Sequence, residues 1–230
     1  MATSRGVQVD PGLPADVSKT AQDYLRAIYK LQSSGVRATT SVLASRMNVT
    51  PPSATSMIKR LAGLGLVEHA PYRGASLTKA GERVALELVR RHRLLELYLS
   101  ESLGLGIDSV HAEADRLEHS LSAQLEAHID RRLGHPSHDP HGDPIPDRTL
   151  KVEELDGRLL VELEPGEEAT IRRVPDGEPE LLRYLSQLSL VPGQRVRLLV
   201  SAPFGGPMTL LVEGSEHAIS REVAVLIGVA

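Results

Sequence analysis

The alternation of apolar and polar positions divides the 230-residue chain into a helical first two thirds and a β-rich last third. Apolar residues recurring every three or four positions predict six helices, over about 18–32, 39–48, 50–63, 78–103, 107–122 and 123–134. Ser18 or Thr20 is expected to cap the first helix and Thr50 the third, whose prolines fall in its first turn. Beyond Lys151, β-branched runs between Pro/Gly turns predict strands within 158–163, 169–174, 194–200, 208–214 and 217–230, interrupted by a helix over 179–190.

Two short helices joined by a tight turn, over about 39–48 and 50–63, form a helix-turn-helix pattern. Residues 66–78 follow as strand, glycine-bearing turn and strand, which predicts a β-wing with Arg73 at its tip. The fold class is therefore mainly α with a small all-β C-terminal domain. We expect a flexible N-terminal arm over 1–17, a winged helix-turn-helix over 18–80, a helical domain over 81–149 and a small β-barrel over 150–230.

Composition and charge narrow the possible functions. The chain has no cysteine, which excludes disulfides, thiolate metal sites and cysteine nucleophiles, and fits the reducing cytoplasm, where we expect it to act. No apolar run reaches membrane-spanning length, and the first residues lack the apolar stretch of a signal peptide, so we expect a flexible arm there and no membrane partner. The net charge is −4, but residues 1–78 hold nine Lys/Arg against four Asp/Glu. A basic first third predicts that this region binds a polyanion.

The stretch "VHAEADRLEH", residues 110–119, gathers ligand-type side chains within one predicted helix. On a helical wheel, His111, Asp115, Glu118 and His119 share an arc that borders the apolar stripe of Val110, Ala114, Leu117 and Leu121. Half-buried carboxylates and imidazoles need partners, and a divalent metal ion satisfies both types at once. The pattern therefore indicates a metal site.

The preceding long helix repeats this motif, since His92 and Glu96 are one turn apart. Three histidines and three carboxylates, without sulfur, suit manganese, ferrous iron, zinc or cobalt. Because imidazoles must be neutral to coordinate, metal binding is expected to weaken as the pH falls. The alternative is that these residues form intrahelical His–carboxylate pairs of modest stabilising effect.

The stretch "HPSHDPHGDPIPDRTL", residues 135–150, is rich in Pro, His and Asp and predicts an ordered loop before the last domain. His135, His138 and His141 are expected to serve the structure of this loop rather than a metal, because their spacing is irregular and Pro-rich.

A winged helix-turn-helix followed by "RRHRLLELYL", "VHAEADRLEHSLS", "DPHGDPIP" and a small β-domain resembles the diphtheria toxin repressor (DtxR) family, from about residue 18 to 230. The resemblance implies a transcriptional repressor that binds double-stranded DNA as a metal-loaded homodimer. Residues 18–80 would then be the DNA-binding domain and 81–149 the metal-binding and dimerisation domain. The last domain would be a small barrel of the Src-homology or FeoA-like type.

Carried over by position, the resemblance places a primary metal site at Asp23, Asp115, Glu118 and His119. A second site would hold His92, Glu96 and His111, completed by Glu178 or, failing that, Glu180 of the C-terminal domain. The iron-responsive branch has Met at position 23 and Cys at position 115, whereas this chain has Asp at both. Oxygen ligands at these two positions favour Mn(II) over Fe(II) as cofactor, with other divalent transition metals expected to bind in vitro.

The start of the predicted recognition helix would face a DNA groove with Pro52, Ser53, Thr55 and Ser56. Lys59, Arg60 and Arg73 are expected to contact phosphates. Dimeric readers of this kind space their recognition helices by about 34–36 Å or a multiple. An ion joining the Asp23 helix to the central scaffold would select that spacing on a palindromic operator.

Two other functions stay open beside the manganese-activated repressor and its Fe(II)-dependent, iron-uptake counterpart. One is a winged-helix regulator that senses a small organic ligand, with the His/carboxylate face purely structural. The other is a metal-dependent hydrolase, which is disfavoured because no nucleophile or spare general base stands near the ligand residues. We therefore expect neither enzymatic activity nor a small organic substrate.

Overall fold

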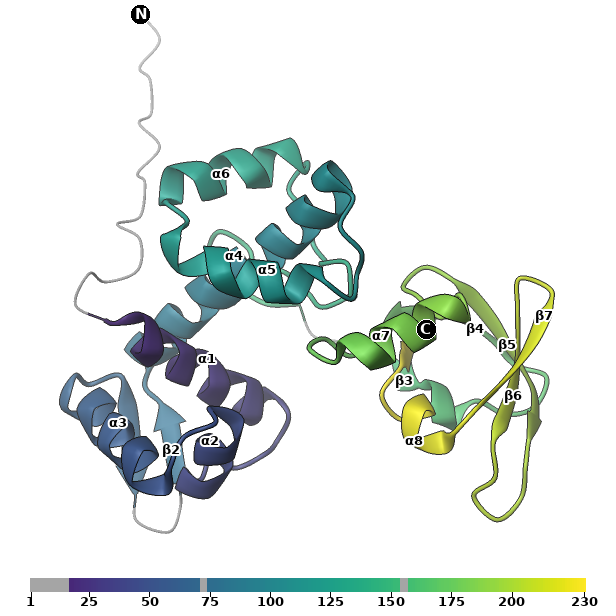
Figure 1. Cartoon of the computed structure of the whole chain (residues 1–230), viewed down its shortest axis with the longest axis horizontal. Coiled ribbons are helices and arrows are strands. Elements are labelled where there is room, and N and C mark those ends of the chain that lie inside the picture. Colours follow the sequence, from purple (N-terminus) through teal and green to yellow (C-terminus); the bar gives the residue numbers. More distant parts are fainter. Residues whose placement is uncertain (1–16, 71–73, 154–156) are drawn as a thin grey trace, which may run out of the picture. The chain divides into compact units, whose positions relative to one another are not determined.

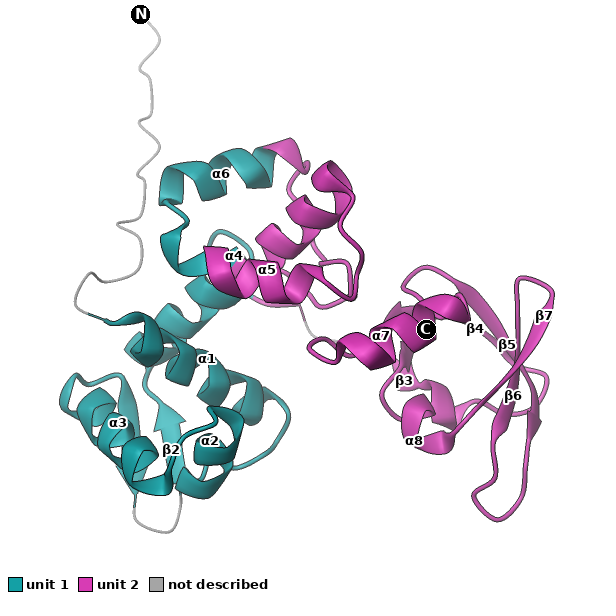
Figure 2. Ribbon diagram, viewed as in Figure 1, with its two compact units in different colours: residues 1–91, 118–131, 146–151 teal, residues 92–117, 132–145, 152–230 magenta. Residues whose placement is uncertain are grey.

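The computed structural model describes residues 17–70, 74–153 and 157–230. Nearly all of the predicted N-terminal arm, and Arg73 at the predicted wing tip, lie outside this range. The chain divides into two compact units (Figure 2), and the long helix α4 contributes to both. The first unit comprises residues 1–91, 118–131 and 146–151, and the second comprises 92–117, 132–145 and 152–230. No helix within the described ranges is long and apolar enough to cross a membrane.

The first unit contains the predicted winged helix. Three helices and a two-stranded antiparallel wing follow one another (Figure 1): α1 (Lys19–Ser33), α2 (Thr40–Arg46), α3 (Pro51–Gly63), β1 (Val67–Ala70) and β2 (Gly74–Leu77). Ser18, Thr39 and Thr50 cap the three helices by accepting a hydrogen bond from a first-turn backbone N–H. The predicted caps at Ser18 and Thr50 are therefore confirmed.

The apolar faces of α1, α2 and α3 form one core. Leu25, Ile28, Leu43, Ile58 and Leu61 are fully buried there. These residues recur at helical spacing in the sequence, and their burial leaves the opposite face of α3 in solvent. The core therefore holds α3 as an exposed helix at the surface of the unit.

The central helices depart from the sequence prediction in one place. They are α4 (Lys79–Leu103), α5 (Val110–Leu117), the 3₁₀ turn η1 (Glu118–Ser120) and α6 (Ala123–Arg132). The expected helix over 107–122 thus ends as an α-helix at Leu117, and Glu118 and His119 lie in a tighter turn of about three residues per turn. The wheel for an unbroken helix puts Leu117 on the buried stripe, whereas 44 % of it is exposed.

The C-terminal part of the second unit is a six-stranded sheet in the order β3-β8-β4-β5-β6-β7. Its strands are β3 (Arg158–Leu159), β4 (Glu168–Arg173), β5 (Arg195–Ser201), β6 (Met208–Val212), β7 (Ser215–Ile219) and β8 (Gly228–Val229). The small helices α7 (Pro179–Gln187) and α8 (Arg221–Ala224) flank them, with a 3₁₀ turn η2 (Leu160–Glu162) (Figure 1). The segments 158–163 and 217–230, expected as strands, are therefore each only partly strand.

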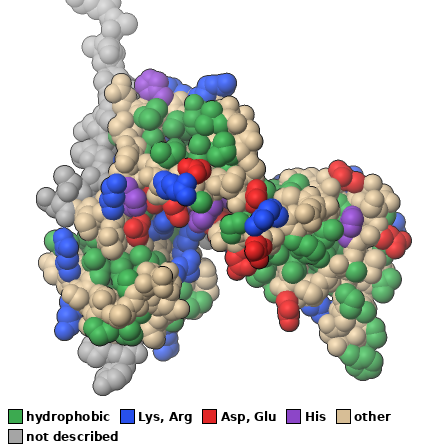
Figure 3. Space-filling model, viewed as in Figure 1, with side chains coloured by type: hydrophobic (Ala, Val, Ile, Leu, Met, Phe, Trp, Pro, Cys, Tyr) green, Lys and Arg blue, Asp and Glu red, His purple; other side chains and the backbone are tan. Residues whose placement is uncertain are grey.

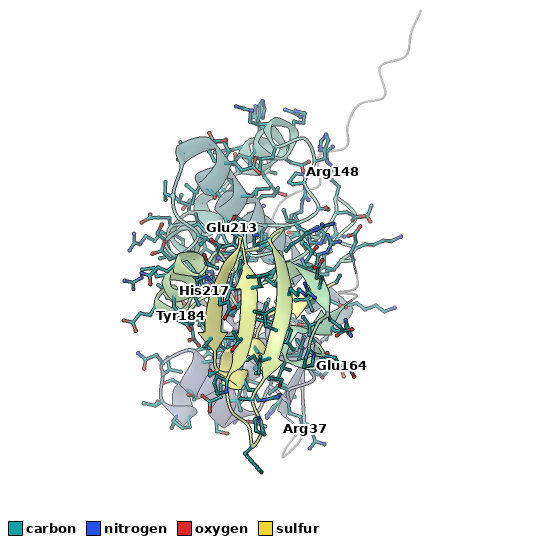
Figure 4. The ribbon with its side chains drawn as sticks, turned by 90° about the vertical axis from the view of Figure 1, so that its right-hand side faces the viewer. Arg37, Arg148, Glu164, Tyr184, Glu213 and His217 are labelled. Carbon is teal, nitrogen blue, oxygen red and sulfur yellow. The ribbon has the colours of Figure 1, made fainter. Side chains whose placement is uncertain are left out.

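The β6–β7 hairpin shows how local sequence determines the register of this sheet. Glu213 and Gly214 form its two-residue turn, both with positive φ, as a type I′ turn requires. Figure 4 looks onto the sheet, with Glu213 at this turn. The β-domain encloses its own core, which includes Leu182 of α7 and Ala224 of α8.

The loop after α6 attaches the β-domain to the helical part of the second unit. The backbone N–H of Val174 donates to His141 O at 2.9 Å, and Arg173 Nε lies 2.9 Å from Asp143 Oδ1. Gly142 has φ +87°, and a Cβ there would lie 1.8 Å from Arg172 O. Only glycine permits that approach, so the turn around His141 is fixed against β4.

Candidate metal centres and DNA-reading helix

The first cluster of ligand-type side chains joins α1 to η1 within the first unit. Asp23 Oδ1 lies 2.9 Å from His119 Nε2, and Glu118 Oε1 lies 3.5 Å from the same nitrogen. Ligands about 2.1 Å from one ion and at right angles to each other lie about 3 Å apart. The three side chains therefore fit one divalent ion, although Asp23 on α1 lies 95 positions before Glu118 on η1. Figure 3 shows histidine and carboxylate side chains together in this region.

Two further residues of α1 hold the cluster in shape. Gln22 Nε2 donates to Val17 O at 2.9 Å, so its Oε1 accepts from His119 Nδ1, also at 2.9 Å. That hydrogen bond leaves His119 Nε2 facing Asp23, where an ion can bind it. Arg26 Nη1 lies 2.7 Å from Glu118 Oε2. Gln22 and Arg26 were not among the predicted metal ligands, and the resemblance marks position 26 only as one where some manganese regulators have a further carboxylate.

Burial dominates the electrostatics of this cluster. The Glu118 side chain is 0 % exposed, and its charge is balanced from α1 by Arg26. Burial raises the pKa of Asp23, although His119 and Arg26 act in the opposite direction. A cation placed between Asp23 and Glu118 would stabilise both ionised carboxylates.

The second cluster lies in the second unit, between α4 and α5. His92 Nε2, His111 Nδ1 and Glu96 Oε1 lie 2.9 to 3.0 Å from one another. Asp115 approaches from α5, with its oxygens 3.4 Å from His92 Nδ1 and 3.8 Å from His111 Nε2. The structure thus groups Asp115 with the histidines of the predicted second site.

Two residues of the 137–145 loop join this cluster on the other side of Glu96. His141 Nδ1 lies 3.8 Å from Glu96 Oε2, and Asp139 offers a ligand atom within 4.8 Å of both. Among the described residues, Glu96 Oε2 and His141 Nδ1 are buried polar atoms without a hydrogen-bond partner. Unsatisfied buried atoms of a carboxylate and an imidazole are what a divalent ion would satisfy.

The charges of the second cluster oppose one another. Burial, the Glu96 charge and the Asp143 charge raise the pKa of Asp139 well above its usual value, against the effect of Arg93. Burial acts in the same direction on Glu96, but hydrogen bonds from His111 and His92 outweigh it and hold the pKa of Glu96 well below its usual value. Asp139 is therefore a buried acid whose pKa stays raised even though Arg93 Nε lies 3.7 Å from its Oδ2.

The His141 loop was predicted to be structural, and neither Asp139 nor His141 was among the predicted ligands. The available signal was "DPHGD", three ionisable residues around an obligatory glycine. Glu178, the expected ligand from the β-domain, is exposed at the N-terminus of α7, and Glu180, two residues further, is exposed as well. At the neighbouring Gly177 a Cβ would lie 3.7 Å from His111 Nε2, so the backbone before α7 adjoins this cluster.

The helix α3 presents the residues predicted to read DNA. Pro52, Ser53, Ser56, Lys59 and Arg60 are exposed and Thr55 is half-buried, while Ala54 and Ile58 face the core. The Ser53 hydroxyl is 2.9 Å from that of Thr50, and the Thr55 hydroxyl donates to Pro51 O. Lys and Arg side chains surround the winged-helix part in Figure 3. A small, polar helix face with flanking cations suits entry into a DNA groove.

A winged helix and clustered His/carboxylate ligands define the class as a DNA-binding regulator that responds to a metal, and comparison with known proteins agrees. Residues 16–75 match the model of the N-terminal DNA-binding domain of iron-dependent repressors. Residues 78–147 match their metal-binding and dimerisation domain, and residues 158–230 match the FeoA domain. The chain is 32 % identical over 210 residues to the iron-dependent repressor IdeR of Mycobacterium tuberculosis, covering 86 % of this chain and 90 % of that one.

Solved structures show the same relation. A manganese-dependent transcriptional repressor in complex with manganese superposes with a TM-score of 0.84 at 38 % identity, covering 91 % of this chain and 99 % of that one. ScaR with bound Zn²⁺ gives a TM-score of 0.77 at 31 % identity, covering 91 % and 98 %. This chain belongs to the diphtheria toxin repressor family of metal-dependent transcriptional repressors.

Proposed function

We propose that this repressor is activated by Mn(II), which binds the first cluster and raises its affinity for a palindromic operator in double-stranded DNA. The observation that carries the proposal is the all-oxygen-and-nitrogen set of Asp23, Glu118 and His119, which lie together across two elements. Carboxylate and imidazole ligands without sulfur suit manganese, although raw affinity follows the usual series and does not by itself select it. The manganese-dependent relatives among the solved structures support this choice, whereas the curated relatives are iron-dependent repressors.

The proposed coupling uses the position of α1. Asp23 belongs to the first helix of the winged-helix fold, and Glu118 and His119 belong to the turn after α5. The bound ion supplies a positive charge that binds both elements at once. Gln22 orients the His119 ring, and the two carboxylates keep α1 against η1, which restricts the reading helix to the arrangement that fits DNA. A coupling of about 1–3 kcal/mol would change operator affinity about 5–150-fold.

The second cluster is proposed as a further ion site at His92, Glu96 and His111, with Asp115 on the α5 side and with Asp139 and His141 on the other side of Glu96. The two buried, unsatisfied atoms at Glu96 and His141 support this proposal. Since Arg173 and Val174 bind the same loop, an ion here would stabilise the attachment of the β-domain. Glu178 is exposed at the start of α7, so it would ligate this ion only after a movement of the turn before α7.

The homodimer forms the third part of the proposal, with 18–80 reading DNA, 81–149 binding metal and dimerising, and 150–230 as the appended barrel. Leu103, Leu117 and Leu125 of the central helices are large apolar residues that stay exposed, from 44 to 60 %. We propose that these side chains contribute to the dimer interface, since contiguous exposed apolar surface marks protein interfaces. A Leu125→Glu variant is expected to sediment as a monomer where the unmodified protein sediments as a dimer.

The experiment selects operator duplexes from a randomised library with manganese-loaded protein and then titrates the selected duplex. Mn(II) is expected to tighten DNA binding, and Fe(II) under anaerobic conditions is expected to tighten it less. The selected operator sequences are expected to show twofold symmetry. Equal affinity with manganese and with a chelator would refute the proposal. A stronger response to Fe(II) would assign the protein to iron control instead.

A further inference from the structure

The fully buried carboxylate of Glu118 already has a cation beside it without any metal ion. Arg26 Nη1 lies 2.7 Å from Glu118 Oε2, and only 15 % of the Arg26 side chain is exposed. The other carboxylate oxygen, Oε1, faces His119 Nε2 at 3.5 Å. The two oxygens of Glu118 are therefore directed to different partners, one to an arginine and one to the cluster.

We propose that Arg26 is a resident counter-cation that competes with the divalent ion for Glu118 and thereby sets the metal affinity of the first cluster. The inference rests on the proposed function, since it assumes that a divalent ion binds at Asp23, Glu118 and His119. A guanidinium keeps its charge throughout the accessible pH range, so this competition cannot be removed by a change of pH. The Arg26 charge contacts Glu118, which is itself a proposed ligand of the ion. The two positive charges therefore repel each other through surroundings of low polarity.

The helix position of Arg26 gives the contact a second consequence. Gln22, Asp23 and Arg26 lie on one face of α1, and each contacts Glu118 or His119. The helix α1 is thus docked on η1 before an ion binds. Because Arg26 holds Oε2, Glu118 offers the ion a single oxygen. The ion then binds only at a concentration high enough to overcome the resident charge.

The test compares Mn(II) affinity in full-length Arg26→Gln, Arg26→Met and Arg26→Lys variants, by competition with a chelating indicator and by the paramagnetic resonance signal of free Mn(II). Both neutral variants are expected to bind Mn(II) at least about tenfold more tightly, about 1.4 kcal/mol, while Arg26→Lys stays close to the unmodified protein. Arg83→Gln serves as a matched control, because Arg83 is an exposed arginine that also pairs with a glutamate, at 3.5 Å. Its removal is expected to leave the affinity unchanged.

A purely structural role for Arg26 predicts the opposite sign, because a misplaced Glu118 would weaken Mn(II) binding in all three variants. Thermal unfolding gives a second readout: the neutral variants are expected to melt lower without metal and to gain more from Mn(II) than the unmodified protein. Because two neutral variants are compared, Arg26→Gln and Arg26→Met, the test still gives a result if one of them fails to fold. Unchanged or weaker Mn(II) binding in a folded neutral variant overturns the inference and leaves the proposed function intact. If His119→Ala binds as much Mn(II) as the unmodified protein, both are overturned.

Discussion

The two clusters use similar ligand types but balance their charges differently. In the first, Glu118 is paired with Arg26, and His119 lies between Gln22 and Asp23. In the second, Glu96 Oε2 and His141 Nδ1 are buried without a hydrogen-bond partner, and Asp139 is buried beside two other carboxylates. Within the described residues, Glu118 Oε1 is also buried without a hydrogen-bond partner, so the two clusters differ in charge balance: Arg26 pairs with Glu118 in the first, whereas burial of Asp139 beside Glu96 and Asp143 outweighs Arg93 in the second.

Because of this difference, we expect the first cluster to act as a metal-responsive switch and the second to act as a structural metal site. A cluster that keeps its shape without the ion can gain and lose it near a threshold, as a regulator requires. A cluster whose buried carboxylates repel one another gains more from an ion, because the added positive charge removes that repulsion. We expect the second cluster to hold its ion more tightly and the first to respond to changes in supply.

The largest effect is expected from removing a ligand of the first cluster. His119→Ala should lower Mn(II) affinity there by at least about 100-fold, more than the loss of a supporting residue around a site. It should also abolish the effect of Mn(II) on DNA binding, while the second ion is still bound. Metal stoichiometry by mass spectrometry and a DNA titration check this. His128→Ala, which removes an exposed histidine of α6, is the control and should change neither quantity.

The next effect concerns Glu96 in the metal-free protein. Glu96→Gln should destabilise it by about 2 kcal/mol at neutral pH, because two histidines lose a charged acceptor. The pKa of Glu96 is held below its unfolded value, so this stability is present above about pH 4.5 and is lost as the pH falls through the lower folded pKa. Urea unfolding at neutral pH and at pH 3 tests this, with the exposed Glu101→Gln as control. A pH-independent difference would refute it.

A smaller change of opposite sign is expected at Asp139. Its pKa is raised in the folded protein, so the ionised form costs stability at neutral pH, and that cost disappears below the unfolded value near 3.8. Asp139→Asn keeps an oxygen for the backbone N–H groups of His141 and Asp143. It should stabilise the metal-free protein by about 1 kcal/mol at neutral pH and reduce the stabilisation by added metal. Destabilisation without metal would show that Arg93 already compensates Asp139.

The smallest effects are expected on α3. Lys59→Gln and Arg60→Gln should each weaken DNA binding similarly for all sequences and reduce the salt dependence by about one ion. Fluorescence titrations at several salt concentrations measure the slope. Arg195→Gln on the β-domain, also exposed, should leave the slope unchanged. A loss confined to one operator sequence would mean that these cations read bases rather than phosphates.

The winged helix was predictable from the sequence because local signals agree there: Ser18 and Thr50 cap helices that bury regular apolar stripes. The ligand residues on α4 and α5 were also visible, since one-turn spacing places them on one face. The resemblance divided them into two sites but assigned Asp115 to the first, whereas the structure places Asp115 with His92 and His111 and tightens the chain into a 3₁₀ turn at Glu118. Arg26 and His141 act through contacts with residues 92 and 45 positions away, which no local pattern contains.

The central claim is that one ion, held by Asp23 together with Glu118 and His119, couples metal to operator. The most direct test measures Mn(II) affinity with and without saturating operator duplex, in the unmodified protein and in Asp23→Ala. Reciprocity predicts that DNA tightens Mn(II) binding by the same factor by which Mn(II) tightens DNA binding, about 5–150-fold. In Asp23→Ala, DNA is expected to leave the Mn(II) affinity unchanged. Equal tightening in both proteins would contradict the claim.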